Sequence, residues 1–283
     1  MARIVYVDGA YQPHERALVH YEDRGYQFSD GAYEVILVRR GRLVDDAPHL
    51  ARLERSLGEL KIERPLAAGA WRQVIRETIR RNRVREGLVY LQVTRGAAPR
   101  DHFFPKAVRP VSVCSASARV WPEPGAQAKG VSAITTPDER WARCDIKSVG
   151  LLANVLAKQA ARDAGAAEAI FVAEDGVVRE GGSSNLWIVD AEGKLRTHPI
   201  DNRILAGVTR ATVKELAETA QIPVLEERFT LDALMGAREA FVTSATSFVK
   251  PVVEIDGKKI GTGEVGPVSQ RLFELYVDYS VAA

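Results

Sequence analysis

The segment Arg143-Cys144-Asp145-Ile146-Lys147-Ser148, followed by Val149-Gly150, marks the point where extended chain gives way to a helix. Just after it, apolar residues recur at positions i, i+1, i+4 and i+5, which predicts one stripe of a helix: Leu151, Leu152, Val155 and Leu156. Lys147 therefore stands at the junction of two elements, and we expect buried neighbours on both sides of it. A lysine amine that is removed from water at such a junction can act as a nucleophile.

The composition is that of a globular protein with ample material for a core. The chain has 283 residues, of which 46% are hydrophobic and 27% charged. This length suits one large domain or two domains of ordinary size. The formal net charge is only +2, so the charge balance gives no indication of nucleic acid or an anionic membrane as a partner.

Cysteine and histidine usage narrows the class further. The two cysteines, Cys114 and Cys144, are too few for a disulfide framework in a chain of this length and indicate a reduced, cytoplasmic protein. The first residues contain too short an apolar run for a signal peptide, and no stretch has the length of a membrane span. The five histidines are scattered without metal-site spacing, so we expect no metal.

Periodicity and turn signals predict a mixed α and β chain. The Asp8-Gly9 turn and the Arg40-Gly41 turn predict hairpins over residues 3 onward and 32–45. Helices are expected over residues 46–60, 71–81, about 151–163, 207–220 and 267–278. Strands are expected over 90–94, 111–114, 131–136, 168–172, 177–180, 186–189 and 240–242.

One short stretch is typical of a linker between two domains. Residues 119–126 contain Pro122 and Pro124, which stiffen the backbone, and each side of the stretch has its own strands and helices. We therefore expect a small domain over 1–118, a linker over 119–126 and a large domain over 127–283.

Two places are suited to bind a phosphate group. A helix is expected to begin at Gly207-Val208-Thr209, where free backbone N–H groups and the helix dipole favour an anion. A predicted strand ends in Thr243-Ser244-Ala245-Thr246-Ser247, whose N–H groups could form an anion-binding nest. With these two segments in view, Arg52 becomes a candidate charge partner for the same phosphate.

Two further sets of polar residues suggest a cofactor ring and a substrate carboxylate. Glu180 ends a β-like run before a glycine pair, where a carboxylate could approach a pyridinium nitrogen and keep it protonated. Arg100 and His102 alternate in an extended loop, so both side chains can project to one side. Together with Tyr33 they offer a guanidinium, an imidazole and a phenol, which suit a substrate carboxylate.

With these pieces in place, the chain resembles the D-amino-acid transaminases of the fold-type IV, class IV pyridoxal-phosphate enzymes over nearly its whole length. Six segments in the family's order carry the resemblance: 26–35, 92–102, 143–147, 180–185, 207–210 and 241–247. It implies an α+β fold of two domains: a small N-terminal α/β domain, and a larger C-terminal domain with a β-barrel-like sheet flanked by helices. It also implies a homodimer.

The resemblance assigns a role to each candidate residue. Lys147 carries the Schiff base with pyridoxal 5'-phosphate (PLP) and moves the proton, while Glu180 holds the pyridine nitrogen. The phosphate is bound by Arg52, Val208, Thr209, Ser244 and Ala245. Tyr33, Arg100 and His102 bind the substrate carboxylate, with the arginine and histidine supplied by the neighbouring subunit. Arg140, Glu168 and Ser183 align with positions that surround the cofactor.

The activity so implied is a two-step transfer of the amino group from a D-amino acid, such as D-alanine, to a 2-oxo acid, such as 2-oxoglutarate. The chain departs from the family pattern at Gly182, where a serine is expected, and at Ala245, where a threonine is common. Alternatives on the same fold are a branched-chain L-amino-acid transaminase, which would need an apolar pocket at the Arg100 loop, and an aminodeoxychorismate lyase. A PLP-binding protein without enzymatic activity is a third alternative.

Overall fold

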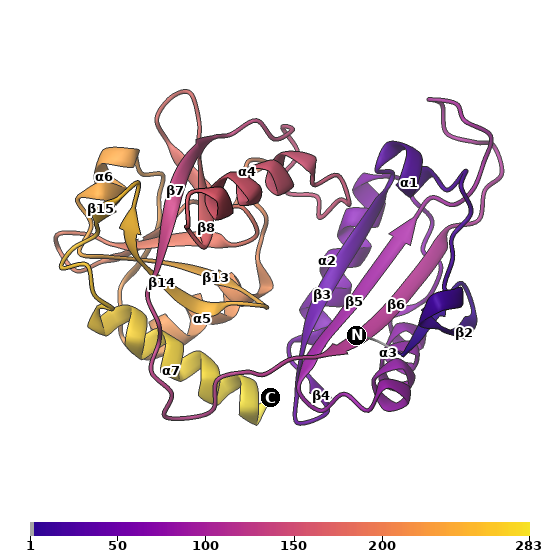
Figure 1. The fold of residues 1–283 in the computed structure, drawn as a ribbon, viewed down its shortest axis with the longest axis horizontal. Coiled ribbons are helices and arrows are strands. Elements are labelled where there is room, and N and C mark those ends of the chain that lie inside the picture. Colours follow the sequence, from indigo (N-terminus) through magenta and orange to yellow (C-terminus); the bar gives the residue numbers. More distant parts are fainter. Residues whose placement is uncertain (1–2) are drawn as a thin grey trace. The chain divides into compact units, whose positions relative to one another are not determined.

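The computed structural model describes residues 3–283, and in it the chain forms two compact units (Figure 1). Unit 1 comprises the residues up to Trp121, Ile146–Gly150 and Ala283, and unit 2 comprises Pro122–Asp145 and Leu151–Ala282. The expected division into 1–118, 119–126 and 127–283 differs from these units at Ile146–Gly150, because that segment pairs with the sheet of unit 1. The division into domains itself remains a prediction.

Unit 1 is built on a six-stranded antiparallel sheet. Its strands, in spatial order, are β2 (Ala10–Pro13), β1 (Ile4–Val7), β6 (Val111–Ala118), β5 (Gly87–Thr94), β3 (Gly31–Arg39) and β4 (Arg42–Leu43). Both predicted hairpins are confirmed, and both turns take positive φ at their two central residues: 44° and 97° at Asp8-Gly9, and 51° and 78° at Arg40-Gly41. Such turns match the twist of the paired strands.

Two helices, α2 (Asp46–Glu59) and α3 (Ala68–Asn82), cover one face of this sheet. Apolar residues at helical spacing meet the sheet in one core, among them Leu50, Leu53 and Leu57 of α2 and Trp71, Ile75 and Ile79 of α3. The strands contribute every second residue, including Val89, Leu91 and Val93 of β5. Because successive strand residues point to opposite faces, Glu34 of β3 points toward α2 and Tyr33 points away.

The Lys147 segment lies along the edge of β3. The N–H of Tyr33 donates to the carbonyl of Lys147 at 3.0 Å, and the N–H of Val149 donates to the carbonyl of Gly31 at 3.0 Å. Ala32 and Ser148 form an antiparallel bridge between these two bonds. The chain therefore adds a short extended segment to unit 1.

Unit 2 contains a nine-stranded mixed sheet. Its main path runs β12 (Val224–Glu226), β11 (Leu195–Thr197), β10 (Asn185–Val189), β13 (Glu239–Ser244), β14 (Phe248–Ile255), β7 (Val131–Pro137), β8 (Glu168–Val172) and β9 (Val178–Gly181), with β15 (Lys258–Lys259) paired to β14. Ile170, Leu186, Val242 and Val252, from four different strands, share one core. The sheet therefore curls around that core, which confirms the expected barrel-like sheet.

Helices α4 (Leu152–Asp163), α5 (Val208–Thr219), α6 (Leu231–Met235) and α7 (Pro267–Ala282) flank this sheet (Figure 1). Small residues let α4 lie close to the sheet, where Ala157 and Ala161 pack on Ala169 and Phe171. The expected helices over 207–220 and 267–278 are confirmed as α5 and α7. No helix among residues 3–283 is long and apolar enough to cross a membrane.

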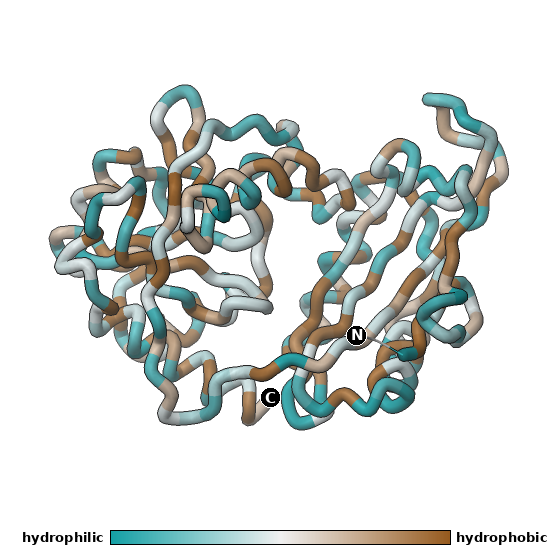
Figure 2. Tube along the Cα trace, in the orientation of Figure 1, coloured by the Kyte–Doolittle hydropathy of each residue, from teal (hydrophilic) through white to brown (hydrophobic). Residues whose placement is uncertain are grey.

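The expectation that the apolar stripe of α4 is buried is wrong for the single chain. Leu152, Val155 and Leu156 are 73%, 57% and 61% exposed, and Figure 2 shows hydrophobic residues along this helix. The helix itself is confirmed, but the face that covers the sheet is the alanine face.

Several elements have no strong sequence signal. Helix α1 (Arg24–Phe28) has five residues and η1 (His14–Arg16) has three, too few for a helical period to appear. Strand β14 contains Pro251, a residue that argues against an interior strand because it lacks an N–H donor.

Two glycines of unit 1 allow a matched stability test. A Cβ on Gly87 would lie 2.1 Å from the carbonyl oxygen of Ser117 on the paired strand, whereas a Cβ on Gly69 in α3 would meet nothing within 4 Å. We expect Gly87→Ala to lower the free energy of unfolding by about 1–3 kcal/mol. We expect Gly69→Ala to raise it by about 0.4–1 kcal/mol. Urea unfolding measures both, and equal effects of the two variants would contradict this packing.

Candidate active site

Lys147 is half-buried between the buried residues Ile146 and Ser148 of unit 1. Its N–H donates to Oγ of Ser56 on α2 at 3.2 Å, and its carbonyl accepts from Tyr33. Its Nζ lies 4.2 Å from the centroid of the Tyr33 ring, within the range of a cation–π contact. The structure therefore brings together the predicted nucleophile and one predicted carboxylate-binding residue.

The Tyr33 ring stacks on a second tyrosine on the same face of the sheet. Its centroid lies 5.8 Å from that of Tyr90, whose hydroxyl donates to Oε1 of Gln92 at 2.6 Å. Burial raises the pKa of Tyr90 to about 12, with Tyr33 as a smaller cause. Tyr90 is therefore a neutral hydrogen-bond donor under ordinary conditions and gives Tyr33 a fixed support.

Arg52 of α2 is held by a buried carboxylate. Its Nε and Nη2 donate to the two oxygens of Glu34 at 2.7 and 2.8 Å, and Nδ1 of His49 lies 2.7 Å from Oε2 of Glu34. Burial alone would raise the pKa of Glu34, but the charge and hydrogen bonds of Arg52, with His49, lower it to about 2. Glu34 is thus ionised and orients Arg52 through a two-pronged contact.

Neither Glu34 nor His49 was anticipated from the sequence. Glu34 did leave a signal, because it is a lone carboxylate inside an apolar run on β3. A charged residue in that position needs a buried partner.

Arg100 and His102 lie on the loop that follows β5, and both are exposed. Cζ of Arg100 lies 4.7 Å from the centroid of the Phe28 ring, and the His102 ring meets the same ring edge-on at 5.6 Å. Their described contacts are thus with Phe28 and not with Tyr33. The pair stays together, as the alternation of the loop predicts.

In unit 2, Glu180 is a fully buried acceptor at the end of β9. Its Oε1 accepts from Nη1 of Arg140 at 2.5 Å, and its Oε2 accepts from Nδ2 of Asn185 at 2.9 Å and from the N–H of Leu205 at 3.1 Å. Burial raises the pKa of Glu180 to about 7, although Arg140 and the Leu205 N–H act to lower it. A carboxyl group with that pKa can hold or release a proton near neutral pH.

Arg140, a predicted neighbour of the cofactor, is fixed on three sides. It donates to both oxygens of Asp138 at 2.8 and 2.9 Å as well as to Glu180, and its Cζ lies 4.2 Å from the centroid of the Phe171 ring. Burial disfavours its charge, but the hydrogen bond to Asp138 and the charge of Glu180 more than offset this and raise the Arg140 pKa. Arg140 therefore remains a cation beside Glu180.

Asn185 connects the segments of unit 2 that were predicted to bind one ligand. It bonds to Glu180 and pairs with Thr243, the residue before Ser244. Gly207 packs against it so closely that a Cβ there would lie 2.0 Å from Oδ1 of Asn185. Asn185 was within a segment noted in the sequence but was assigned no role, since only the pairing of β10 with β13 shows its position.

The two predicted phosphate-binding segments have free backbone donors or a tight turn. Helix α5 begins at Val208 after Gly207, and no side chain caps its first N–H groups, so the amides of Val208 and Thr209 suit an anion. At the end of β13, Oγ of Ser244 contacts Oγ of Ser247 at 2.6 Å, which closes the turn through Ala245.

Glu168 holds the loop between β9 and β10. It accepts from the N–H of Gly182 at 3.2 Å, from Oγ of Ser184 at 2.9 Å and from Nζ of Lys158 at 2.9 Å. Ser183, which was predicted to contact the cofactor, is exposed, and Ser184 is the serine that bonds to Glu168.

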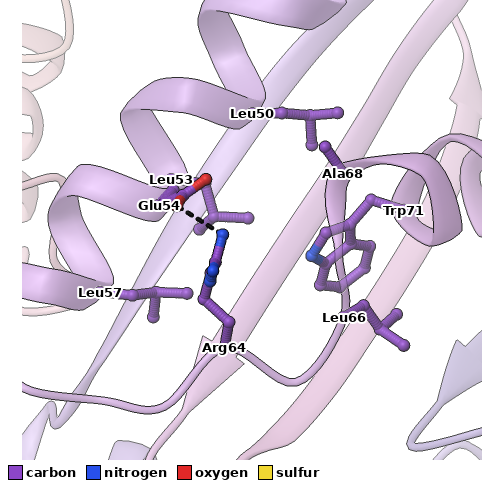
Figure 3. A pocket seen from close by; sticks show the side chains of 8 residues that line it. All are labelled: Leu50, Leu53, Glu54, Leu57, Arg64, Leu66, Ala68 and Trp71. Atoms are coloured by element: carbon purple, nitrogen blue, oxygen red, sulfur yellow. Dashed lines mark hydrogen bonds and ion pairs between the residues drawn. The ribbon is translucent and has the colours of Figure 1, made fainter.

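A small hollow between α2 and α3 contains none of the predicted site residues. Figure 3 shows it lined by Leu50, Leu53, Glu54, Leu57, Arg64, Leu66, Ala68 and Trp71. An ion pair of 2.5 Å joins the exposed side chains of Glu54 and Arg64 beside it. The hollow is therefore a gap in the packing of two helices with no chemistry directed into it.

Comparison with known proteins identifies the family. Residues 31–255 match the family described as amino-transferase class IV. Since this range includes most of the chain, the protein belongs to the class IV aminotransferases and is an enzyme that transfers an amino group. The resemblance drawn from the six segments is confirmed.

Relatives with nearly the same length are named for one substrate. The chain is 41% identical to a D-alanine aminotransferase of Staphylococcus haemolyticus over 97% of both chains. It is 42% identical to a D-alanine aminotransferase of Staphylococcus epidermidis over 96% of this chain and 97% of the relative.

Solved structures of branched-chain aminotransferases share the fold. The enzyme of Thermoproteus uzoniensis, solved with norvaline, covers 99% of this chain, with 95% of its own covered, at 27% identity and a TM-score of 0.88. A second branched-chain amino acid aminotransferase, from T.th. and solved with pyridoxamine 5'-phosphate, covers 100% of this chain, with 95% of its own covered, at 28% identity and a TM-score of 0.91. The expected fold-type IV architecture is thus confirmed.

The buried Glu34 ion pair predicts a large loss of stability on neutralisation. Glu34→Gln keeps the shape of the side chain but leaves the buried Arg52 without its charge partner, so we expect a loss of about 3–5 kcal/mol in the free energy of unfolding. Glu77→Gln is the control, because Glu77 pairs with Arg80 and Arg81 at the surface of α3, where solvent screens the charges. Urea unfolding should leave this control unchanged, and a Glu34→Gln variant as stable as wild type would contradict the assignment.

The raised pKa of Glu180 predicts a pH-dependent stability difference. Its pKa is 4.5 in the unfolded chain and about 7 in the folded one, so its stabilising contribution is complete below 4.5 and is lost as pH rises through 7. In cofactor-free protein, wild type should lose roughly 2–3 kcal/mol relative to Glu180→Gln between about pH 5 and about pH 8. Urea unfolding at both pH values measures this, and a difference independent of pH would disprove it.

Proposed function

We propose that this aminotransferase moves the amino group of a D-amino acid, such as D-alanine, to a 2-oxo acid, such as 2-oxoglutarate, with PLP as its cofactor. The observation that carries the proposal is the position of the Lys147 amine over the Tyr33 ring, because it sets a proton carrier beside a group suited to a substrate carboxylate. Identity of 41–42% to D-alanine aminotransferases over nearly the whole chain supports the substrate class.

The donor groups of the chain fit PLP. The uncapped N–H groups of α5 and the fixed guanidinium of Arg52 are suited to its phosphate. Glu180, with a pKa raised to about 7 by burial, can share a proton with its ring nitrogen. When bound, PLP supplies an aromatic ring that takes up the electrons released at the substrate Cα.

In this proposal the residues of the chain divide the remaining work. Lys147 removes the proton from Cα and returns it at the cofactor carbon, and Tyr33 keeps the amine in position. Arg140 and Asn185 hold the Glu180 carboxyl group in place. Ser244, Ala245, Val208 and Thr209 bind the phosphate through their N–H groups, and Ser183 and Glu168 belong to the loop beside the cofactor.

Stereochemistry follows from which groups bind the carboxylate. If Tyr33, Arg100 and His102 hold it on one side, only one enantiomer presents its Cα–H to Lys147 without exchanging the carboxylate and the side chain. We assign that enantiomer as D.

The proposal includes a homodimer in which Arg100 and His102 serve the neighbouring subunit. The exposed stripe of Leu152, Val155 and Leu156 on α4 supports it, because a contiguous apolar surface is characteristic of a subunit interface. We also propose a cytoplasmic location, since Cys114 and Cys144 are both free thiols.

The structural likeness to the two branched-chain aminotransferases favours an L-amino-acid transaminase as the second candidate. That likeness comes with lower sequence identity, 28% against 41%, than the relatives named for D-alanine. The exposed cations Arg100 and His102 also suit a carboxylate better than a branched apolar side chain.

The first test compares enantiomers in steady state with PLP supplied. We expect 2-oxoglutarate to accept the amino group of D-alanine, with pyruvate and glutamate formed in equal amounts, at a rate at least about 100-fold above that with L-leucine. Lys147→Ala should lower the rate at least about 100-fold, the range lost with a positioned proton-transfer group.

Lys129→Ala, on an exposed lysine, is the control and should retain wild-type rates. A preference for L-leucine would overturn the D-amino-acid assignment and leave the family intact. Release of pyruvate without glutamate would indicate a lyase, and near-normal activity of Lys147→Ala would remove Lys147 from the mechanism.

A further inference from the structure

One aromatic ring contacts both cationic residues of the predicted carboxylate site. Phe28 is the last residue of α1, and its ring centroid lies 4.7 Å from Cζ of Arg100 and 5.6 Å from the centroid of His102. Among residues 3–283, the described side-chain contacts of Arg100 and His102 both go to this ring. All of these contacts lie within unit 1 of one chain.

The Phe28 ring is itself supported by a buried arginine. Arg24, only 3% exposed, lies with its Cζ 4.6 Å from the Phe28 centroid. Its Nε donates to Oδ2 of Asp30 at 2.9 Å, and its Nη1 donates to the carbonyl of Asp101 at 2.6 Å. Asp101 lies between Arg100 and His102, so Arg24 holds the backbone of the pair while Phe28 contacts the side chains.

The base of the loop is fixed by the same carboxylate. Arg95 donates to both oxygens of Asp30 at 2.7 and 3.0 Å and to the carbonyls of Leu60 and Lys61 at 2.7 and 2.9 Å. The N–H of Arg24 donates to the carbonyl of Gly96 at 2.9 Å. The exposed tip with Arg100 and His102 therefore rises from a rigid base, and Phe28 connects the two.

We propose that Phe28 is a positioning residue that holds Arg100 and His102 side by side, so that both bind one substrate carboxylate. The inference rests on the proposed function. The face of an aromatic ring attracts cations without offering a hydrogen-bond acceptor that competes with the carboxylate. Two long side chains that are ordered before the substrate arrives lose less entropy when it binds.

Arg24 does not compete for the same carboxylate, because Asp30 already neutralises its charge. Its bond to the Asp101 carbonyl fixes the backbone, so that residues on either side of Asp101 project together. The order of this exposed loop is therefore set by α1, a helix of five residues.

The test uses the PLP-loaded enzyme with D-alanine and 2-oxoglutarate. Phe28→Leu should raise KM for both substrates roughly 10-fold and change kcat less than about 3-fold, because both substrates present a carboxylate to the same pair. Phe28→Tyr keeps the ring and should behave as wild type.

The matched control is Phe104→Leu. Phe104 lies in the same loop with its ring 3.8 Å from Cζ of Arg95, but Arg95 is held by Asp30 and two carbonyls and is not part of the carboxylate site. Its KM values should equal those of wild type. A rise as large as that of Phe28→Leu would show a general loosening of the loop and would overturn the inference.

A double-mutant cycle separates this inference from the proposed function. If Phe28 acts through the pair, Phe28→Leu should raise KM no further when Arg100→Ala and His102→Ala are already present. An additive rise, or a raised KM in the pair variant alone with Phe28→Leu unchanged, would overturn the positioning role and leave the carboxylate site in place. Wild-type KM in the Arg100→Ala, His102→Ala variant would instead overturn the carboxylate site itself.

Discussion

The backbone pairing of Ile146–Gly150 with the edge of β3 is the constraint on which the rest of unit 1 depends. The two hydrogen bonds from Tyr33 to Lys147 and from Val149 to Gly31 set the register of this short segment. A slip of one residue would turn the Lys147 side chain to the other face. In the observed register its amine lies over Tyr33, while the next residue of β3, Glu34, points to the helices and holds Arg52. One strand thus supplies supports for two predicted functions on its two faces.

Buried carboxylates with cationic partners recur throughout the structure. Glu34 holds Arg52, Asp30 holds Arg24 and Arg95, and Glu180 contacts Arg140. Burying such charges costs free energy that the pairing only partly offsets, so these contacts fix geometry more than they stabilise the fold. Glu34 and Glu180 show how the surroundings decide the outcome: two donating side chains lower the pKa of one to about 2, and burial raises that of the other to about 7.

Much of the fold could be predicted because its signals are local. Asp8-Gly9 and Arg40-Gly41 specify their hairpins, and the leucines of α2 specify that helix. The site residues came from the order of six segments, and their roles remain predictions. What the sequence could not provide depends on contacts between distant segments. Asn185 acquires its position through the pairing of β10 with β13, and Phe28 through contacts with a loop more than seventy residues away. The exposure of the α4 stripe was mispredicted because periodicity shows that a face is apolar but not what covers it.

The central claim is that Lys147, fixed at the edge of β3, is the lysine that binds the cofactor. The direct measurement is borohydride reduction of the PLP-loaded protein followed by peptide mass spectrometry. The account predicts a single stoichiometric pyridoxyl group on the peptide that contains Lys147. A stoichiometric pyridoxyl group on another lysine, such as Lys158 or Lys250, with Lys147 unmodified, would contradict it.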